Sequence, residues 1–176
     1  MTADSRELYW APLDEQLRAF IDEHRTILLH ILDGLSEDEV RMRLVPSKTT
    51  LLGLVKHAVF VERVWFEERV TGASRAELGI AAGPDESFDL DPEDTSASVT
   101  AELRKTIAAS RRAVQGLDMD SVLICTRRGT LSLRWVCLHV LRELAQHCGH
   151  AEILREQILA ARTAEPSEQA PGATGS

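Results

Sequence analysis

Residues 142–156, RELAQHCGHAEILRE, lie within the longest amphipathic stretch of the sequence. Apolar residues recur there at intervals of three and four, which predicts a helix with one buried face. Ser132 can cap the start of this helix, and we expect it to run to about Ala161. Its inward-facing residues are predicted to be Trp135, Val136, Val140, Leu144, Ala151, Leu154 and Ile158. A long helix with a single apolar face is typical of helical bundles.

Four polar side chains interrupt the buried side of this helix. At about 100° per residue, Glu143 and His147 differ by about 40° and therefore share one face. His139 and His150 fall within the same arc of about 80°. Burial without partners would cost roughly a few kcal/mol for each group. We therefore expect these side chains to share a ligand or hydrogen-bond partners.

Two further amphipathic stretches lie in the first half of the chain. The spacing of apolar residues predicts a helix that begins at Leu13, and Gly34 predicts its end. A capping box predicts a short helix over residues 36–44. Thr49 or Thr50 can cap the second long helix. Its apolar stripe is expected at Leu51, Leu54, Ala58, Val61 and Trp65.

Residues 71–91 are rich in Gly, Ala, Asp and Pro and show little periodicity. This composition is typical of a long connection, which we expect to cross the bundle. Asp91 as N-cap and Pro92 as first helical residue then predict a third helix that ends near Leu117.

The periodicity breaks over residues 118–130, where Arg127, Arg128 and Gly129 predict a turn. No strand alternation competes with the helices. The sequence therefore predicts an all-α four-helix bundle with a long crossover connection between helices 2 and 3. We expect one domain over residues 1–161 and a disordered C-terminal tail over residues 162–176.

The composition excludes several classes of function. The 176 residues are 44% hydrophobic and 27% charged, which is ordinary for a globular domain. A net charge of −8 argues against binding to nucleic acid. No apolar run reaches the roughly 20 residues of a membrane span. The first residues do not resemble a secretory signal, and three cysteines without CxxC spacing fit reduced thiols. We therefore expect a cytoplasmic protein with no nucleic-acid or membrane partner.

An ExxxH pair on one helix, joined by a histidine from a neighbouring helix, is a recurrent way to hold a divalent metal in a bundle. Glu143 and His147 form such a pair, and His57 is the best-placed third ligand. His24 in the first helix is its competitor. Spacing alone leaves open that the pair is merely hydrogen-bonded and that His57 is a satisfied core histidine.

Two segments taken together indicate a family more specifically than the ExxxH spacing alone. They are LLGLVKHAVFVERVWF at residues 51–66 and LSLRWVCLHVLRELAQHCGHAEILRE at residues 131–156. In these segments the chain resembles the DinB/YfiT-like metalloprotein superfamily and, within it, the actinobacterial mycothiol S-transferases. The resemblance covers about residues 13–160 and implies a four-helix bundle with a three-ligand metal site. It places the ligands at His57, Glu143 and His147. The wider superfamily often has a histidine where this chain has Glu143.

This ligand set suits thiol chemistry. Two neutral imidazoles and one carboxylate leave Zn²⁺ with a net charge of +1 and one open position, which fits a thiolate. We expect a divalent metal, Zn²⁺ first with Ni²⁺ or Mn²⁺ as alternatives, and mycothiol as co-substrate of a metal-dependent thiol S-transferase that acts on a small electrophile. The alternatives are a metal-dependent hydrolase that uses the same three residues and a non-enzymatic, stress-associated metal-binding protein.

Other polar residues are candidates for roles around the metal. We expect His150 to be catalytic; as a neighbour of His147 it could carry a proton, bind substrate or orient a ligand. His24, His139, Arg127 and Arg128 are expected to bind substrate, the two arginines by gripping a carboxylate of the thiol. For each of these residues a structural role in the core or in a solvated loop remains the alternative.

Val59 and Val70 are apolar residues that we expect to be exposed on a helix face. On this ground we expect a homodimer, although single exposed apolar residues are normal on any surface.

Overall fold

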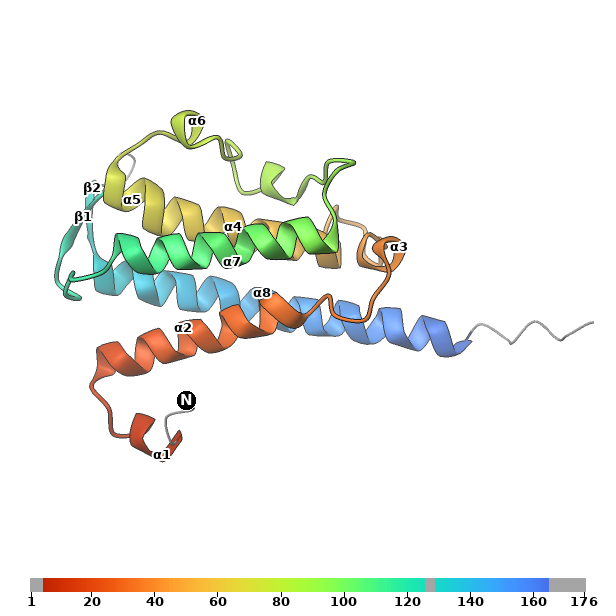
Figure 1. Ribbon diagram of the computed structural model, residues 1–176, viewed down its shortest axis with the longest axis horizontal. Helices are drawn as coiled ribbons and strands as arrows, with labels where there is room; N and C mark the ends of the chain where they lie inside the picture. The colour runs from red at the N-terminus through yellow and green to blue at the C-terminus, as the bar shows by residue number, and fades with distance from the viewer. Residues whose placement is uncertain (1–4, 126–128, 165–176) are drawn as a thin grey trace, which may run out of the picture.

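The computed structural model describes residues 5–125 and 129–164. Four long helical segments lie side by side along the molecule (Figure 1), which confirms the predicted all-α bundle. They are α2 (Leu13–His30), α4 (Leu51–Glu62), α7 (Ser96–Ala113) and α8 (Leu133–Ala164). The α4 segment continues through a π-helical stretch, η1 (Arg63–Glu68), into α5 (Arg69–Thr71). None of the helices described is both long and apolar enough to cross a membrane.

The predicted apolar stripes form the core of the bundle. In the core α2 packs against α8, and α4 packs against both α7 and α8. Each long helix contributes fully buried leucines, as expected for interdigitated helix faces. Examples are Leu28, Leu54, Leu103 and Leu144. Trp135 is an exception: the residue is 37% exposed, so its predicted place in the core is wrong.

The crossover connection between α4 and α7 carries short helical turns. They are α6 (Arg75–Leu78) and η2 (Glu86–Phe88), and the connection passes along the outer side of α4 and α7 in Figure 1. Two other short helices, α1 (Ser5–Leu8) and α3 (Glu37–Val40), precede and follow α2. The capping box predicted at Ser36 and Glu39 is present at the start of α3.

The start of the third long helix was predicted wrongly at Asp91 and Pro92. Helix α7 begins at Ser96, with Thr95 as its N-cap. The Asp94 carboxylate accepts a hydrogen bond from the backbone N–H of Asp91 at 2.7 Å and also binds the ammonium group of Lys56. These contacts hold the four residues before Thr95 in a turn, so the helix starts later.

A two-stranded antiparallel hairpin joins α7 to α8, so the prediction that no strand is present was also wrong. Its strands are β1 (Val122–Cys125) and β2 (Gly129–Ser132). Leu123 is buried, whereas Val122 and Ile124 are more than half exposed. Three residues of alternation are too few to distinguish a strand from a loop in the sequence.

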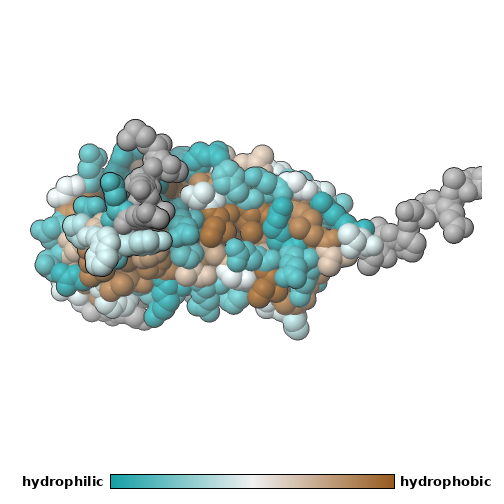
Figure 2. Space-filling model, turned by 90° about the horizontal axis from the view of Figure 1, so that it is seen from below, coloured by the Kyte–Doolittle hydropathy of each residue, from teal (hydrophilic) through white to brown (hydrophobic). Residues whose placement is uncertain are grey.

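Val59 and Val70 are half-buried against the core, so their predicted exposure is wrong. Exposed apolar side chains lie elsewhere, at Trp10, Leu138 and Ile153 among others. Figure 2 shows separate hydrophobic patches between hydrophilic residues on the face that it presents. The homodimer stays a prediction.

A buried ion pair ties α2 to α4. The guanidinium of Arg25 donates from Nε and Nη2 to the two carboxylate oxygens of Glu62, each at 2.8 Å. Its Nη1 also donates to Asp22 Oδ1 at 2.9 Å, and the guanidinium lies 5.5 Å from the centre of the Phe66 ring. Arg25 is 7% exposed and Glu62 is fully buried. Bidentate geometry offsets part of the desolvation cost of two buried charges.

We predict that Glu62→Ala lowers the free energy of unfolding by about 3–5 kcal/mol, because it leaves the Arg25 charge buried without its carboxylate. Urea unfolding measures this change. Glu67→Ala is the matched control, since Glu67 forms a partly exposed ion pair with Arg63 on the same helical segment and should cost about 1 kcal/mol or less. Equal effects of the two substitutions would contradict the role assigned to the buried pair.

Candidate metal centre

Three side chains meet where α4 packs against α8: His57 from α4, and Glu143 and His147 from α8. Each offers one ligand atom, and these atoms all lie within 4.8 Å of one another. The Glu143 Oε2 and His147 Nε2 atoms are 3.6 Å apart. The His57 and His147 rings are 4.7 Å apart between centroids and nearly perpendicular. The predicted ExxxH pair and the predicted partner on α4 are thus brought together.

Burial keeps both imidazoles of this group neutral. His57 is 4% exposed, and burial lowers its pKa to about 3, with a smaller lowering from the neighbouring His147. Burial also lowers the pKa of His147, against the opposing effect of the Glu143 carboxylate. At neutral pH each ring therefore keeps a nitrogen lone pair, as a metal ligand requires.

One ring nitrogen of the group has no hydrogen-bond partner in the described part of the chain, and the donor set suits a cation. The Nδ1 atom of His147 is buried and has no hydrogen-bond partner among the residues that the structure describes. Leaving such a polar atom unpaired is unfavourable. Two histidines and one carboxylate form the ligand set of several catalytic zinc sites, in which the fourth position stays open. The residues present therefore fit a divalent cation.

The second oxygen of Glu143 faces another group of side chains. Its Oε1 atom lies 3.7 Å from His139 Nε2 and 3.6 Å from Arg142 Nη2. The Arg142 guanidinium donates to His139 Nδ1 at 2.9 Å. The His139 ring packs against Trp65 and stacks almost parallel to Trp135, with centroids 4.1 Å and 5.1 Å away. These contacts orient Glu143 so that Oε2 faces His147.

The outer ring nitrogen of His57 is held by η2. Its Nδ1 atom lies 2.6 Å from the hydroxyl of Ser87, and the Phe88 ring stacks on the imidazole at 4.2 Å between centroids. Nothing in the sequence marks Ser87 or Phe88, because both fall in the connection without periodicity. A buried imidazole signals that some partner exists for its second nitrogen, but it does not identify that partner.

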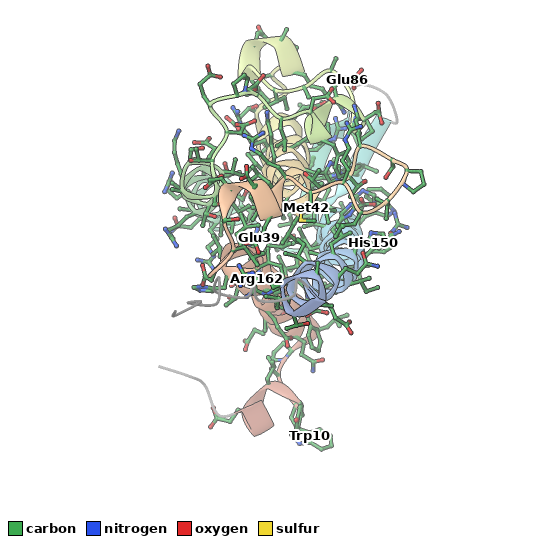
Figure 3. The ribbon with its side chains drawn as sticks, turned by 90° about the vertical axis from the view of Figure 1, so that its right-hand side faces the viewer. Trp10, Glu39, Met42, Glu86, His150 and Arg162 are labelled. Atoms are coloured by element: carbon green, nitrogen blue, oxygen red, sulfur yellow. The ribbon has the colours of Figure 1, made fainter. Side chains whose placement is uncertain are left out.

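His150 lies at the rim of the group. It is exposed on α8, one turn after His147, with 5.9 Å between the two ring centroids. Figure 3 views the bundle from the end at which α8 finishes and labels His150 on that helix. A hollow of about 260 Å³ adjoins His150. Its walls are mostly apolar and come from the segment before α4 and from α8: Val45, Ser47, Thr49, Ile153, Leu154 and Gln157.

Of the remaining candidates, His24 lies apart from the three ligands. His24 Nδ1 donates to the Phe20 carbonyl oxygen at 2.6 Å, and the His24 carbonyl oxygen is 3.5 Å from Cys148 Sγ. Burial raises the pKa of the Cys148 thiol to about 12, so it stays protonated. His24 therefore lies near the Cys148 side of α8 and is not a member of the group formed by His57. Arg127 and Arg128 lie outside the described residues.

The chain matches a family model described as "Mycothiol-S-transferase" over residues 16–160. Because the match spans most of the chain, the protein belongs to this family, and the expected resemblance is confirmed. A comparison with curated proteins gave no match.

We predict one tightly held zinc ion per chain after loading with Zn²⁺ and dialysis against metal-free buffer. Elemental analysis should show that Glu143→Ala and His147→Ala lose this ion, because each removes one of three ligands. Glu152→Ala changes an exposed carboxylate of the same helix and should retain it. Retention of the full zinc content by Glu143→Ala would contradict the assignment of the ligands.

We predict that the metal-free protein loses stability in acid. The pKa of His57 is about 3 in the folded chain and about 6.5 in an unfolded chain, so the unfolded state binds more protons between these values. The free energy of unfolding should therefore rise with pH from about 3 to about 6.5 and then level off.

Urea unfolding at several pH values in this range measures this dependence. His57→Gln should reduce it, whereas His30→Gln, which changes an exposed imidazole, should leave it unchanged. An identical pH dependence in His57→Gln and the parent protein would show that His57 is not held neutral by burial.

Proposed function

We propose that this member of the mycothiol S-transferase family is a divalent-metal-dependent transferase that joins the sulfur of mycothiol to a small electrophile. The observation that carries the proposal is the convergence of His57, Glu143 and His147 at the α4–α8 contact in a chain of this family. We propose Zn²⁺ as the metal, and the cytoplasm as the compartment in which the thiol is available.

Each ligand has a chemical reason to be present. A bound zinc ion would lower the pKa of a thiol and stabilise the thiolate in its open position. His57 and His147 are kept neutral by burial, so only Glu143 contributes charge. The net charge of +1 that remains favours an anionic sulfur over a neutral one. The packing of His139 and Arg142 near Glu143 Oε1 keeps this carboxylate in one orientation.

His150 is suited to take the thiol proton. Its ring is exposed and lies one helical turn from His147, so it can exchange protons with solvent. We propose that a ring nitrogen of His150 accepts the proton as the thiol ionises. The sulfur then forms a bond to the electrophilic carbon, and the leaving group departs with the electron pair of the bond that breaks.

The hollow beside His150 is the proposed site for the electrophile. Val45, Ile153 and Leu154 give it apolar walls, and among the residues that the structure describes no lysine or arginine lines it. A neutral, partly apolar acceptor fits these walls better than an anion, because an anion would lose hydration without gaining a charged partner.

We predict that the zinc-loaded protein accelerates the reaction of mycothiol with 1-chloro-2,4-dinitrobenzene, followed by absorbance. His57→Ala should abolish the acceleration because it removes a ligand. His150→Gln should lower kcat by about 10²-fold or more while the zinc content stays unchanged. His30→Gln is the control on the first long helix and should behave as the parent.

Two results would contradict the proposed reaction. Turnover of an ester or amide without added thiol would indicate a hydrolase. No turnover of either kind, together with a loss of thermal stability on chelation, would indicate a structural metal.

A further inference from the structure

The η2 turn packs directly on the imidazole of His57. Ser87 is buried at 3% exposure, and its hydroxyl lies 2.6 Å from His57 Nδ1. The same hydroxyl donates to the Pro84 carbonyl oxygen at 2.6 Å. Both contacts are short enough to be hydrogen bonds between well-placed partners.

The direction of these two hydrogen bonds follows from counting hydrogens. A carbonyl oxygen can only accept, so the single hydroxyl hydrogen of Ser87 goes to Pro84. The Ser87 oxygen must then accept from His57, which means that Nδ1 carries the proton. In a neutral imidazole the other nitrogen, Nε2, is left with the lone pair.

Phe88 and Gly53 hold the turn in place. The Phe88 ring lies nearly parallel to the imidazole, at an angle of 12°. Gly53, one turn before His57 on α4, lets the backbone of the turn approach, because a Cβ at residue 53 would lie 3.2 Å from the Phe88 carbonyl oxygen. The ring of His57 is thus fixed in both its plane and its rotation.

We propose that Ser87 is a positioning residue that holds His57 in the tautomer with a protonated Nδ1, so that Nε2 presents its lone pair to the metal. The inference rests on the metal centre of the proposed function and adds a residue from the crossover connection to it. The hydrogen bond from Ser87 to the Pro84 carbonyl oxygen fixes the hydroxyl, and the fixed hydroxyl orients the His57 ring. Carboxylates and carbonyls orient metal-bound histidines in the same way.

The first test measures zinc affinity by competition with a chromophoric chelator. Ser87→Ala removes the acceptor for Nδ1–H, so we expect its Kd for Zn²⁺ to rise about 10- to 100-fold. Ser74→Ala is the matched control, because Ser74 is a serine of the same connection that caps α6 and hydrogen-bonds to Glu77, not to His57. It should leave the zinc Kd within about twofold of the parent. An equally small change in Ser87→Ala would overturn the proposal.

The second test reads the tautomer itself and does not need the metal. Nitrogen-15 NMR of the metal-free parent at neutral pH should show His57 with Nδ1 protonated and Nε2 unprotonated. Ser87→Ala should shift this signal toward a mixture of tautomers, which a merely structural role of Ser87 would not do.

Protonated Nε2 in the parent would overturn the proposal even if Ser87→Ala does not fold. A parent that shows the expected tautomer but binds no zinc would instead contradict the metal centre of the proposed function. The two failures are therefore distinguishable.

Discussion

The structure depends on the meeting of hydrogen-bond acceptors at the contact between α4 and α8. Burial keeps His57 and His147 neutral, and the charged carboxylate of Glu143 faces the same space. A divalent cation held between these groups would accept the ring lone pairs and pair with the carboxylate charge. The buried Arg25–Glu62 pair and the η2 turn both hold α4. The same fold that buries the core therefore also fixes the geometry of the three ligands.

Much of this arrangement could be predicted from local patterns. Apolar residues at intervals of three and four predicted the long helices, because each of these helices buries one face in the common core. The four-residue spacing of Glu143 and His147 placed both on one face, since that depends only on helix geometry. The residue pattern made His57 the best-placed third ligand and left His24 as its competitor. Packing decides between them, because it sets which histidine faces α8 at the level of Glu143 and His147, and the family resemblance had pointed to His57.

Three features could not be predicted from local patterns. Ser87 meets His57 across 30 residues, and no periodicity marks its segment. The cap expected at Asp91 is lost because Lys56 and the backbone of Asp91 both bind the Asp94 carboxylate. The β1–β2 hairpin is too short for an alternation to be visible in the sequence.

The central claim is that His57, Glu143 and His147 hold a cation that keeps one position open for a thiol. X-ray absorption spectroscopy at the zinc edge tests it most directly. The loaded protein should show nitrogen and oxygen ligands at about 2.0–2.1 Å, and addition of mycothiol should add one sulfur at about 2.3 Å. A zinc shell that contains sulfur before the thiol is added, or that gains none afterwards, would contradict the account.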